Sequence, residues 1–195
     1  STAAISPINN QAAVPDAPPV ADRQARARAS EAYGKLPLRF EGNDGQSDEQ
    51  VRFLSRGSGY DLFLTPTEAV LAMKATHRQS IVRMKLVGAA LEPRVEGVDV
   101  LPGMSNYLIG NDPDKRRRKV KNYAKVRCQS VYRGIDLIYY GNQQQLEYDF
   151  VVAPGADPSA IRLDFDGVER IEMDARGDLI LHTGGGAIVQ RRPVV

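Results

Sequence analysis

The sequence predicts an all-β protein of the antiparallel β-sandwich type, built as one sandwich or as two small sandwiches in series, with little helix. From Leu36 onward, apolar and polar residues alternate with period two, which places successive side chains on opposite faces of a strand. Gly, Asn and Asp fall between the alternating runs, where they favour tight turns. No segment shows a helical apolar period over three turns, so short strands joined by turns are expected throughout.

Four segments show the alternation most clearly. Their apolar positions are Val82, Met84 and Leu86; Leu146, Tyr148, Phe150 and Val152; Ile161, Leu163 and Phe165; and Ile171 and Met173, with charged residues between them. Strands with one apolar and one polar face are typical of antiparallel sheets that bury a single side. We therefore expect the apolar positions of all four segments to face the core.

Turn sequences predict three hairpins and help to assign one ambiguous segment. The turns lie at 56–59, between the runs 51–55 and 60–64; at Gly141 and Asn142, between 135–140 and 145–152; and at 174–177. The segment 68–74, EAVLAMK, contains good helix formers, but it is short and follows a Thr-Pro-Thr turn. We expect it to be a strand.

The chain divides by composition into two parts. Residues 1–32 are rich in Ala, Pro, Gln and Asn, and this composition cannot bury enough apolar surface to offset the entropy lost on ordering. We expect a flexible N-terminal linker there. Residues 33–195 are expected to form the β-sandwich domain, with an internal boundary near residues 100–115 if there are two sandwiches.

The overall composition narrows the classes of function. Lys and Arg number 26 against 24 Asp and Glu, a formal charge of +2, so a nucleic-acid partner is not expected. No apolar run is long enough to span a bilayer, and we expect no transmembrane segment. The single cysteine, Cys128, excludes an internal disulfide and a cysteine-based zinc site. No cofactor is expected, and Cys128 is expected to be a small buried strand residue.

Several stretches in succession carry a family resemblance. They are LRFEGNDG at 38–45, SNYLIGND at 105–112, YAKVR at 123–127, and VYRGIDLIYYG at 131–141, which leads into LEYDFVVAPG at 146–155. Together they resemble the N-terminal domain of bacterial proteins that carry SBBP, or seven-bladed β-propeller, repeats. The chain departs from that pattern in its basic run at 115–119, where the family usually has a Trp and fewer charges, and at Cys128, where it usually has an aromatic residue.

The resemblance implies a location and a partner. Proteins of this kind are typically exported and surface-associated, so an extracellular or cell-surface location is expected, with a signal peptide removed or outside this sequence. The downstream propeller or other modules of the same polypeptide would then be the partners. The domain has no assigned activity in that family, and we expect a non-catalytic structural or interaction module that precedes the propeller repeats.

The strongest local charge feature is a basic run that could bind an anionic ligand. Its residues are Lys115, Arg116, Arg117, Arg118, Lys119, Lys121, Lys125 and Arg127. Such charge density suits sulfated glycans or lipid headgroups, so a binding domain for anionic glycan or a membrane surface is the alternative function. Charge runs are more often solvated loops or edge strands protected from pairing, and an exposed polar loop is also a candidate for proteolysis.

Other candidate sites are weaker. The acidic stretches at 43–49 and 111–114 could supply oxygen ligands to calcium, but Asn-Asp-Gly and Asn-Asp-Pro are also ordinary turn sequences, and no metal site is assigned. Neither His77 nor His182 has zinc-ligand spacing, while Glu147 and Asp149 would lie on one strand face. No catalytic residue is assigned, and a hydrolase is the remote alternative. The many tyrosines suit an interface with a neighbouring module.

Overall fold

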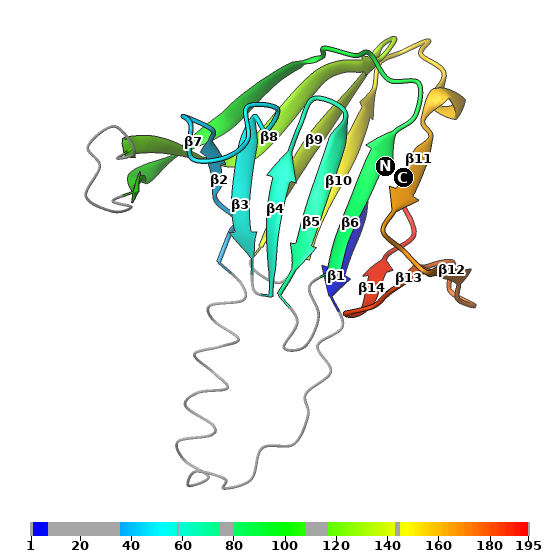
Figure 1. Cartoon of the computed structure of the whole chain (residues 1–195). Coiled ribbons are helices and arrows are strands. Elements are labelled where there is room, and N and C mark those ends of the chain that lie inside the picture. Colours follow the sequence, from blue (N-terminus) through cyan, green and yellow to red (C-terminus); the bar gives the residue numbers. More distant parts are fainter. Residues whose placement is uncertain are drawn as a thin grey trace, which may run out of the picture.

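The computed structural model describes residues 2–7, 36–57, 59–74, 80–107, 117–142 and 145–194, and these form an all-β domain (Figure 1). The strands are β1 (Thr2–Pro7), β2 (Phe40–Gly42), β3 (Phe53–Gly57), β4 (Tyr60–Leu64), β5 (Glu68–Met73), β6 (Ser80–Leu86), β7 (Arg94–Tyr107), β8 (Arg117–Tyr132), β9 (Ile135–Asn142), β10 (Gln145–Val152), β11 (Leu163–Asp166), β12 (Arg170–Met173), β13 (Leu179–Thr183) and β14 (Gly186–Gln190). One short 3-10 turn, Pro158–Ala160, precedes β11. The prediction of an antiparallel all-β fold with little helix is confirmed.

The strands form a curled half-barrel of eleven strands, β1 to β11, and a small sheet of three, β12 to β14. All pairs are antiparallel, and the hydrogen-bonded order is β11-β6-β5-β4-β3-β2-β8-β9-β10-β1-β14-β13-β12, with β7 paired to β8. The small sheet joins the half-barrel through β1, which pairs with β10 on one side and β14 on the other. Figure 1 shows the half-barrel as an arch with the small sheet beside one leg.

The long strand β8 is the point from which the sheet branches. Its residue Tyr123 pairs with both Phe40 of β2 and Val100 of β7, whereas Val126 pairs with β7 and with Tyr139 of β9. Because a strand residue has only two lateral neighbours, β7 occupies one side of β8, and β2 and β9 share the other. One branch, through β2 to β6, and a second, through β9 and β10, therefore diverge from the same strand.

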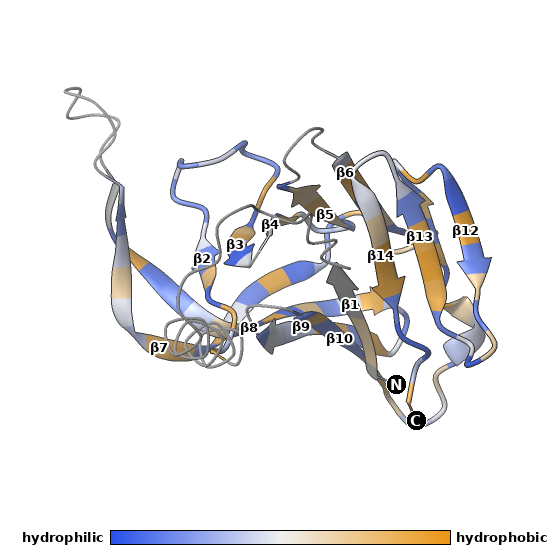
Figure 2. Cartoon of the chain, turned by 90° about the horizontal axis from the view of Figure 1, so that it is seen from below, coloured by the Kyte–Doolittle hydropathy of each residue, from blue (hydrophilic) through white to orange (hydrophobic). Residues whose placement is uncertain are grey.

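Side chains from both branches fill one core. Figure 2 views the arch from below, with β3 to β5 on one side of the interior and β8 to β10 on the other. The largest side chains that are fully buried are Tyr60, Tyr139, Tyr148, Phe40, Leu38, Leu62, Leu64, Met84, Ile135, Leu137 and Leu146. The sandwich expected from the sequence is thus one curled sheet whose two branches enclose a common core.

The structure confirms the clearest alternations and corrects others. Val82, Met84 and Leu86 are buried while Arg83 is exposed, as predicted. Ile171 and Met173 were expected to face the core, but Met173 is 71% exposed and Ile171 is exposed too. The reason is position: β12 is the edge of the small sheet and pairs only with β13, so its apolar side chains extend past the buried region.

Three of the tyrosines considered for a module interface are core residues instead. Tyr132, Tyr139 and Tyr148 are buried in the core. The rings of Tyr139 and Tyr148 lie 6.2 Å apart, and the Tyr132 hydroxyl donates to the carbonyls of Val87 and Arg162 at 3.2 and 3.1 Å. These rings therefore stabilise the domain rather than extend its surface.

The predicted linker does not hold for its first residues. Thr2–Pro7 form β1, whereas residues 8–35 of the expected linker at 1–32 lie outside the described residues. The strand was not predicted because its buried positions Ala3 and Ala4 are small, and its stabilising partners, β10 and β14, are remote in sequence. Of the boundary expected near 100–115, residues 100–107 belong to β7 and residues 108–116 lie outside the described part.

Candidate functional site

The end of β7 and the beginning of β8 form a two-stranded ribbon at the surface. The pairing of β2 with β8 stops at Asn122, but β8 remains paired with β7 through Lys121, Val120 and Arg117. Residues 101–107 and 117–121, here called the ribbon, therefore have no neighbouring strand in the described chain except each other. In Figure 1 this ribbon extends past the edge of β2.

A polar cluster ties the ribbon to the half-barrel. The guanidinium of Arg56 on β3 donates to the Tyr107 hydroxyl at 2.6 Å and to Glu41 Oε1 at 3.2 Å, and it lies 5.2 Å from the Tyr107 ring centre. The Tyr107 hydroxyl in turn donates to Glu41 Oε2. Burial, followed by the bond to Glu41, raises the pKa of Tyr107, so its hydroxyl stays protonated as a donor. The ribbon is held in a defined position.

Exposed apolar and basic side chains lie together on and beside the ribbon. Val100 is 67% exposed and Met104 is 55% exposed, and Met104 pairs directly with the exposed Lys121. Lys119 is also exposed and has a positive φ of 63°, in the bulge where the register of β7 and β8 shifts. Both kinds of side chain are therefore accessible to a partner.

The structure divides the basic run that the sequence singled out. Lys115 and Arg116 lie outside the described residues, and Arg117 and Arg118 belong to β8. Lys119 and Lys121 are exposed on the ribbon and form no ion pair with a described residue. Farther along β8, Lys125 pairs with Asp99 at 3.2 Å and Arg127 pairs with Asp136 at 2.5 Å. Only the ribbon part therefore presents cations without described acidic partners.

The ion pair of Arg127 and Asp136 has a structural role at the other end of β8. Asp136 accepts from the backbone N–H of Ser130 at 2.7 Å and from Arg127 Nε and a terminal nitrogen at 3.1 and 2.5 Å. Ser130 has a positive φ of 52° near the end of β8, where the register with β9 shifts. Burial of the carboxyl acts to raise its pKa, but these donors outweigh it and lower the pKa of Asp136.

Asp136→Asn is expected to lower the free energy of unfolding at pH 7 by about 1–2 kcal/mol. This loss is smaller than that expected for a fully buried hydrogen bond between charged groups, because Arg127 is partly exposed. The folded pKa of Asp136 lies below its ordinary value of 3.8. The stabilisation is therefore present above about pH 4 and is lost as the pH falls through the lower folded pKa. Urea unfolding from pH 7 to pH 2 measures this. Glu92→Gln, at an exposed loop position, is the control; a deficit in Asp136→Asn that persists at pH 2 contradicts the assignment.

Cys128 is a core residue, as expected from the sequence. It is buried on β8, and burial raises the pKa of its thiol to about 12. Because the thiolate is the reactive form, the native protein is expected to resist a thiol-specific reagent at pH 8 and to react fully once unfolded in guanidinium. Following the colour released by the reagent measures both rates; equal rates in the two states would contradict the burial.

The acidic and histidine candidates that the structure describes make local contacts. Asn43 closes its turn by donating to the carbonyls of Asp48 and Val51 at 2.7 and 2.8 Å, which is turn chemistry. Within the described residues, no three His, Cys, Asp or Glu side chains gather in a way that could hold a metal ion. His182 Nε2 lies 2.9 Å from Glu172 on the small sheet. Residues 111–114 and His77 lie outside the described residues.

The acids considered for glycoside hydrolysis, Glu147 and Asp149, are neighbours on one face of β10 and are half-buried. In the pairing of β10 with β9, Glu147 lies opposite Tyr140 and Asp149 lies opposite Ile138.

No helix in the described ranges is long and apolar enough to cross a membrane.

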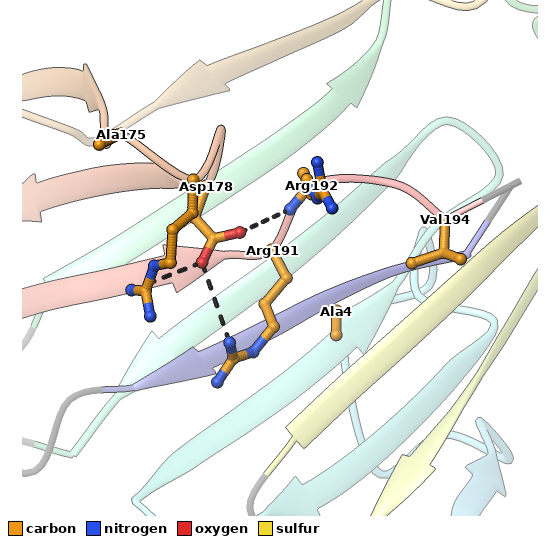
Figure 3. A pocket seen from close by; sticks show the side chains of 7 residues that line it. Ala4, Ala175, Asp178, Arg191, Arg192 and Val194 are labelled. Atoms are coloured by element: carbon orange, nitrogen blue, oxygen red, sulfur yellow. Dashed lines mark hydrogen bonds and ion pairs between the residues drawn. The ribbon is translucent and has the colours of Figure 1, made fainter.

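Sequence reasoning missed one concave site. A hollow of about 500 Å³ lies between β1 and the small sheet, and Arg176, Arg191 and Arg192 line it together with Asp178 (Figure 3). Arg176 lies fifteen positions before the adjacent pair Arg191 and Arg192, so the three form no charge run in the sequence. Only the pairing of β13 with β14 brings them together.

Comparison with known proteins gives a family for the chain. Residues 40–195 match the family model DUF7948, described as a domain of unknown function. This match spans β2 to β14, and so contains both branches of the half-barrel, the ribbon and the small sheet. No curated protein and no solved structure matches the chain. The chain therefore belongs to the DUF7948 family of domains of unknown function.

Proposed function

We propose that this domain is a non-catalytic structural and interaction module, and that the ribbon is its contact element. The observation that carries the proposal is that Met104 and Lys121 are exposed on the ribbon, where β7 and β8 pair only with each other in the described chain, and that the exposed Val100 lies beside it. Apolar side chains of this size gain free energy when a partner covers them. The cluster of Arg56, Glu41 and Tyr107 holds the ribbon in place before binding, which reduces the entropic cost of association.

The resemblance to the N-terminal domain of SBBP-repeat proteins supports a setting for this module. In that setting it is part of an exported bacterial surface protein, and its nearest partners are the propeller or other modules of the same polypeptide. The ribbon offers both apolar contacts and an edge strand for such a neighbour.

A second candidate is binding of an anionic glycan or an anionic membrane surface by the ribbon. Lys119 and Lys121 favour it because they are exposed and form no ion pair with a described residue. The sequence has four further cations directly before Lys119: Lys115, Arg116, Arg117 and Arg118. Binding by this route depends on ionic strength, since exposed charges are screened over about 8 Å at physiological salt.

A binding screen separates these candidates. The full chain is tested against a heparin-derived octasaccharide and against vesicles containing phosphatidylserine, at low and physiological salt, beside Lys119→Ala/Lys121→Ala. The control is Arg133→Ala/Arg162→Ala, which removes two exposed cations away from the ribbon. Salt-sensitive binding lost only in the lysine variant supports the anionic ligand, and equal loss in both variants contradicts it.

The contact-element proposal is tested with Val100→Ser/Met104→Ser and a separately produced propeller module of the kind proposed as the partner. Weaker association than the unaltered chain, with unchanged thermal stability, is expected. Unchanged association in this variant and in the lysine variant contradicts the ribbon as the contact element.

A further inference from the structure

The hollow beside the small sheet presents guanidinium groups around one buried acid. Asp178 is only 4% exposed, and its carboxylate accepts the backbone N–H of Arg192 at 3.0 Å. It lies 3.7 Å from a terminal nitrogen of Arg176 and 3.9 Å from one of Arg191. Both distances exceed that of a hydrogen bond, so Asp178 attracts these guanidinium groups without occupying their donors.

The arginines differ in how much of their donor capacity is already used. Arg176 donates twice to Asp174, at 3.1 and 3.0 Å, which fixes its fork at the edge of the hollow. The Arg191 side chain makes no hydrogen bond to a described residue, and neither does that of Arg192. Each of these two retains a planar set of N–H donors that suits a carboxylate or phosphate group.

Charge and lining agree on the kind of ligand. Three arginines against Asp174 and Asp178 leave one net positive charge around the hollow. Ala4, Ala175 and Val194 supply an apolar part of the wall (Figure 3). An anion with a short apolar stem would satisfy the free donors and cover this wall.

We propose that the hollow lined by Arg176, Arg191 and Arg192 is a binding site for a small organic anion, a carboxylate or phosphate group on a short aliphatic stem. The anion pairs with the guanidinium of Arg191, which makes an ion pair with Asp178 but no hydrogen bond to it, and with Arg192, while Arg176, held by Asp174, closes the other side. Asp178 holds the 191–192 segment through its bond to the Arg192 N–H, and its charge limits affinity. The site is independent of the ribbon and of the function proposed for it.

The probes are glutarate, which has an aliphatic stem, and inorganic phosphate, which has none. Each is titrated into the isotope-labelled full chain, and the amide shifts of residues 174–178 and 189–194 are followed by NMR. Saturable shifts are expected with glutarate, at lower concentration than with phosphate. Binding of phosphate but not of glutarate would overturn the proposal that the ligand has an aliphatic stem. The absence of a saturable shift with either probe would overturn the binding site itself.

Three variants test the residues. Arg191→Ala is expected to weaken glutarate binding at least fivefold, as loss of a charged hydrogen bond requires, while Arg162→Ala leaves it unchanged. Asp178→Asn keeps an oxygen acceptor for the Arg192 N–H but removes a negative charge beside the guanidinium groups, and is expected to strengthen anion binding roughly two- to fivefold.

If the role of Asp178 is purely structural, Asp178→Asn will bind glutarate more weakly. That result would overturn the electrostatic role proposed for Asp178. If Arg191→Ala fails to fold, Arg191→Lys replaces it: the charge remains but the fork is lost, and at least threefold weaker binding is expected. Unchanged binding in Arg191→Lys would then overturn the assignment of Arg191. Lys119→Ala/Lys121→Ala, on the ribbon, is expected to bind glutarate like the unaltered chain.

Discussion

Phe40→Ala is expected to lower the free energy of unfolding by about 3–5 kcal/mol, the range for loss of a fully buried Phe side chain. Phe40 has no exposed surface and lies on β2 opposite Tyr123, where the first branch of the sheet leaves β8. Its ring belongs to the single core shared by both branches, so a cavity there weakens the packing of both. For a domain of this size, we expect the melting temperature to fall by about 10 °C.

The adjacent Arg39→Ala is the matched control, because Arg39 is exposed on the same segment and its loss is expected to change stability by no more than about 0.5 kcal/mol. Thermal and urea unfolding of both variants, followed by circular dichroism, gives the comparison. A single cooperative transition in Phe40→Ala, shifted as a whole, is expected for one core. Two separate transitions would contradict the common core.

Gly167→Ala is expected to destabilise the domain by at least 2 kcal/mol. Gly167 follows β11 with a φ of 80°, which costs a residue with a Cβ about 1–2 kcal/mol. An added Cβ would also lie 1.9 Å from the carbonyl oxygen of Ile81 on β6, so the backbone must shift, at a further cost of about 1–3 kcal/mol. The turn that places β11 against β6 therefore favours glycine at residue 167.

Gly155 separates the two contributions, because it has the same φ of 80° with open space where its Cβ would be. Gly155→Ala is expected to cost only the backbone part, about 1–2 kcal/mol. Urea unfolding of the two variants gives the difference. Equal destabilisation in both would show that the close approach to Ile81 is not a real constraint.

Most strands could be predicted from local pattern alone. The period-two runs around Val82 and Leu146 and the turns at 56–59 and 174–177 form the elements that the sequence indicates, because one-sided burial and turn geometry are local properties. The segment 68–74 is likewise a strand, β5, over Glu68–Met73. The residues that determine each of these strands lie within the strand or in the turns beside it.

The wrong predictions concern residues whose burial depends on strands that are remote in sequence. Ala3 and Ala4 give no apolar signal, yet they are buried because β10 and β14 pair with β1 on both sides. Met173 has the right alternation but lies on an edge strand with one neighbour. A pattern along one strand does not state how many strands flank it.

The candidate site shows the same limit. The basic run is visible in the sequence, but the sequence does not show which of its cations have acidic partners. Lys125 and Arg127 pair with Asp99 and Asp136, which the pairings of β8 with β7 and β9 bring close. The exposure of Met104 beside Lys121 likewise depends on where β2 ends. Charge density can be read from a sequence, whereas its neutralisation depends on the fold.

The most direct test of the ribbon as the contact element is to map binding by NMR on the isotope-labelled full chain, adding the heparin-derived octasaccharide and, separately, a propeller module of the kind that we propose as its partner. We expect the perturbed amides to cluster at residues 100–107 and 117–121, with β4 to β6 unaffected. Perturbation concentrated on other strands, or none with either partner, would contradict the account.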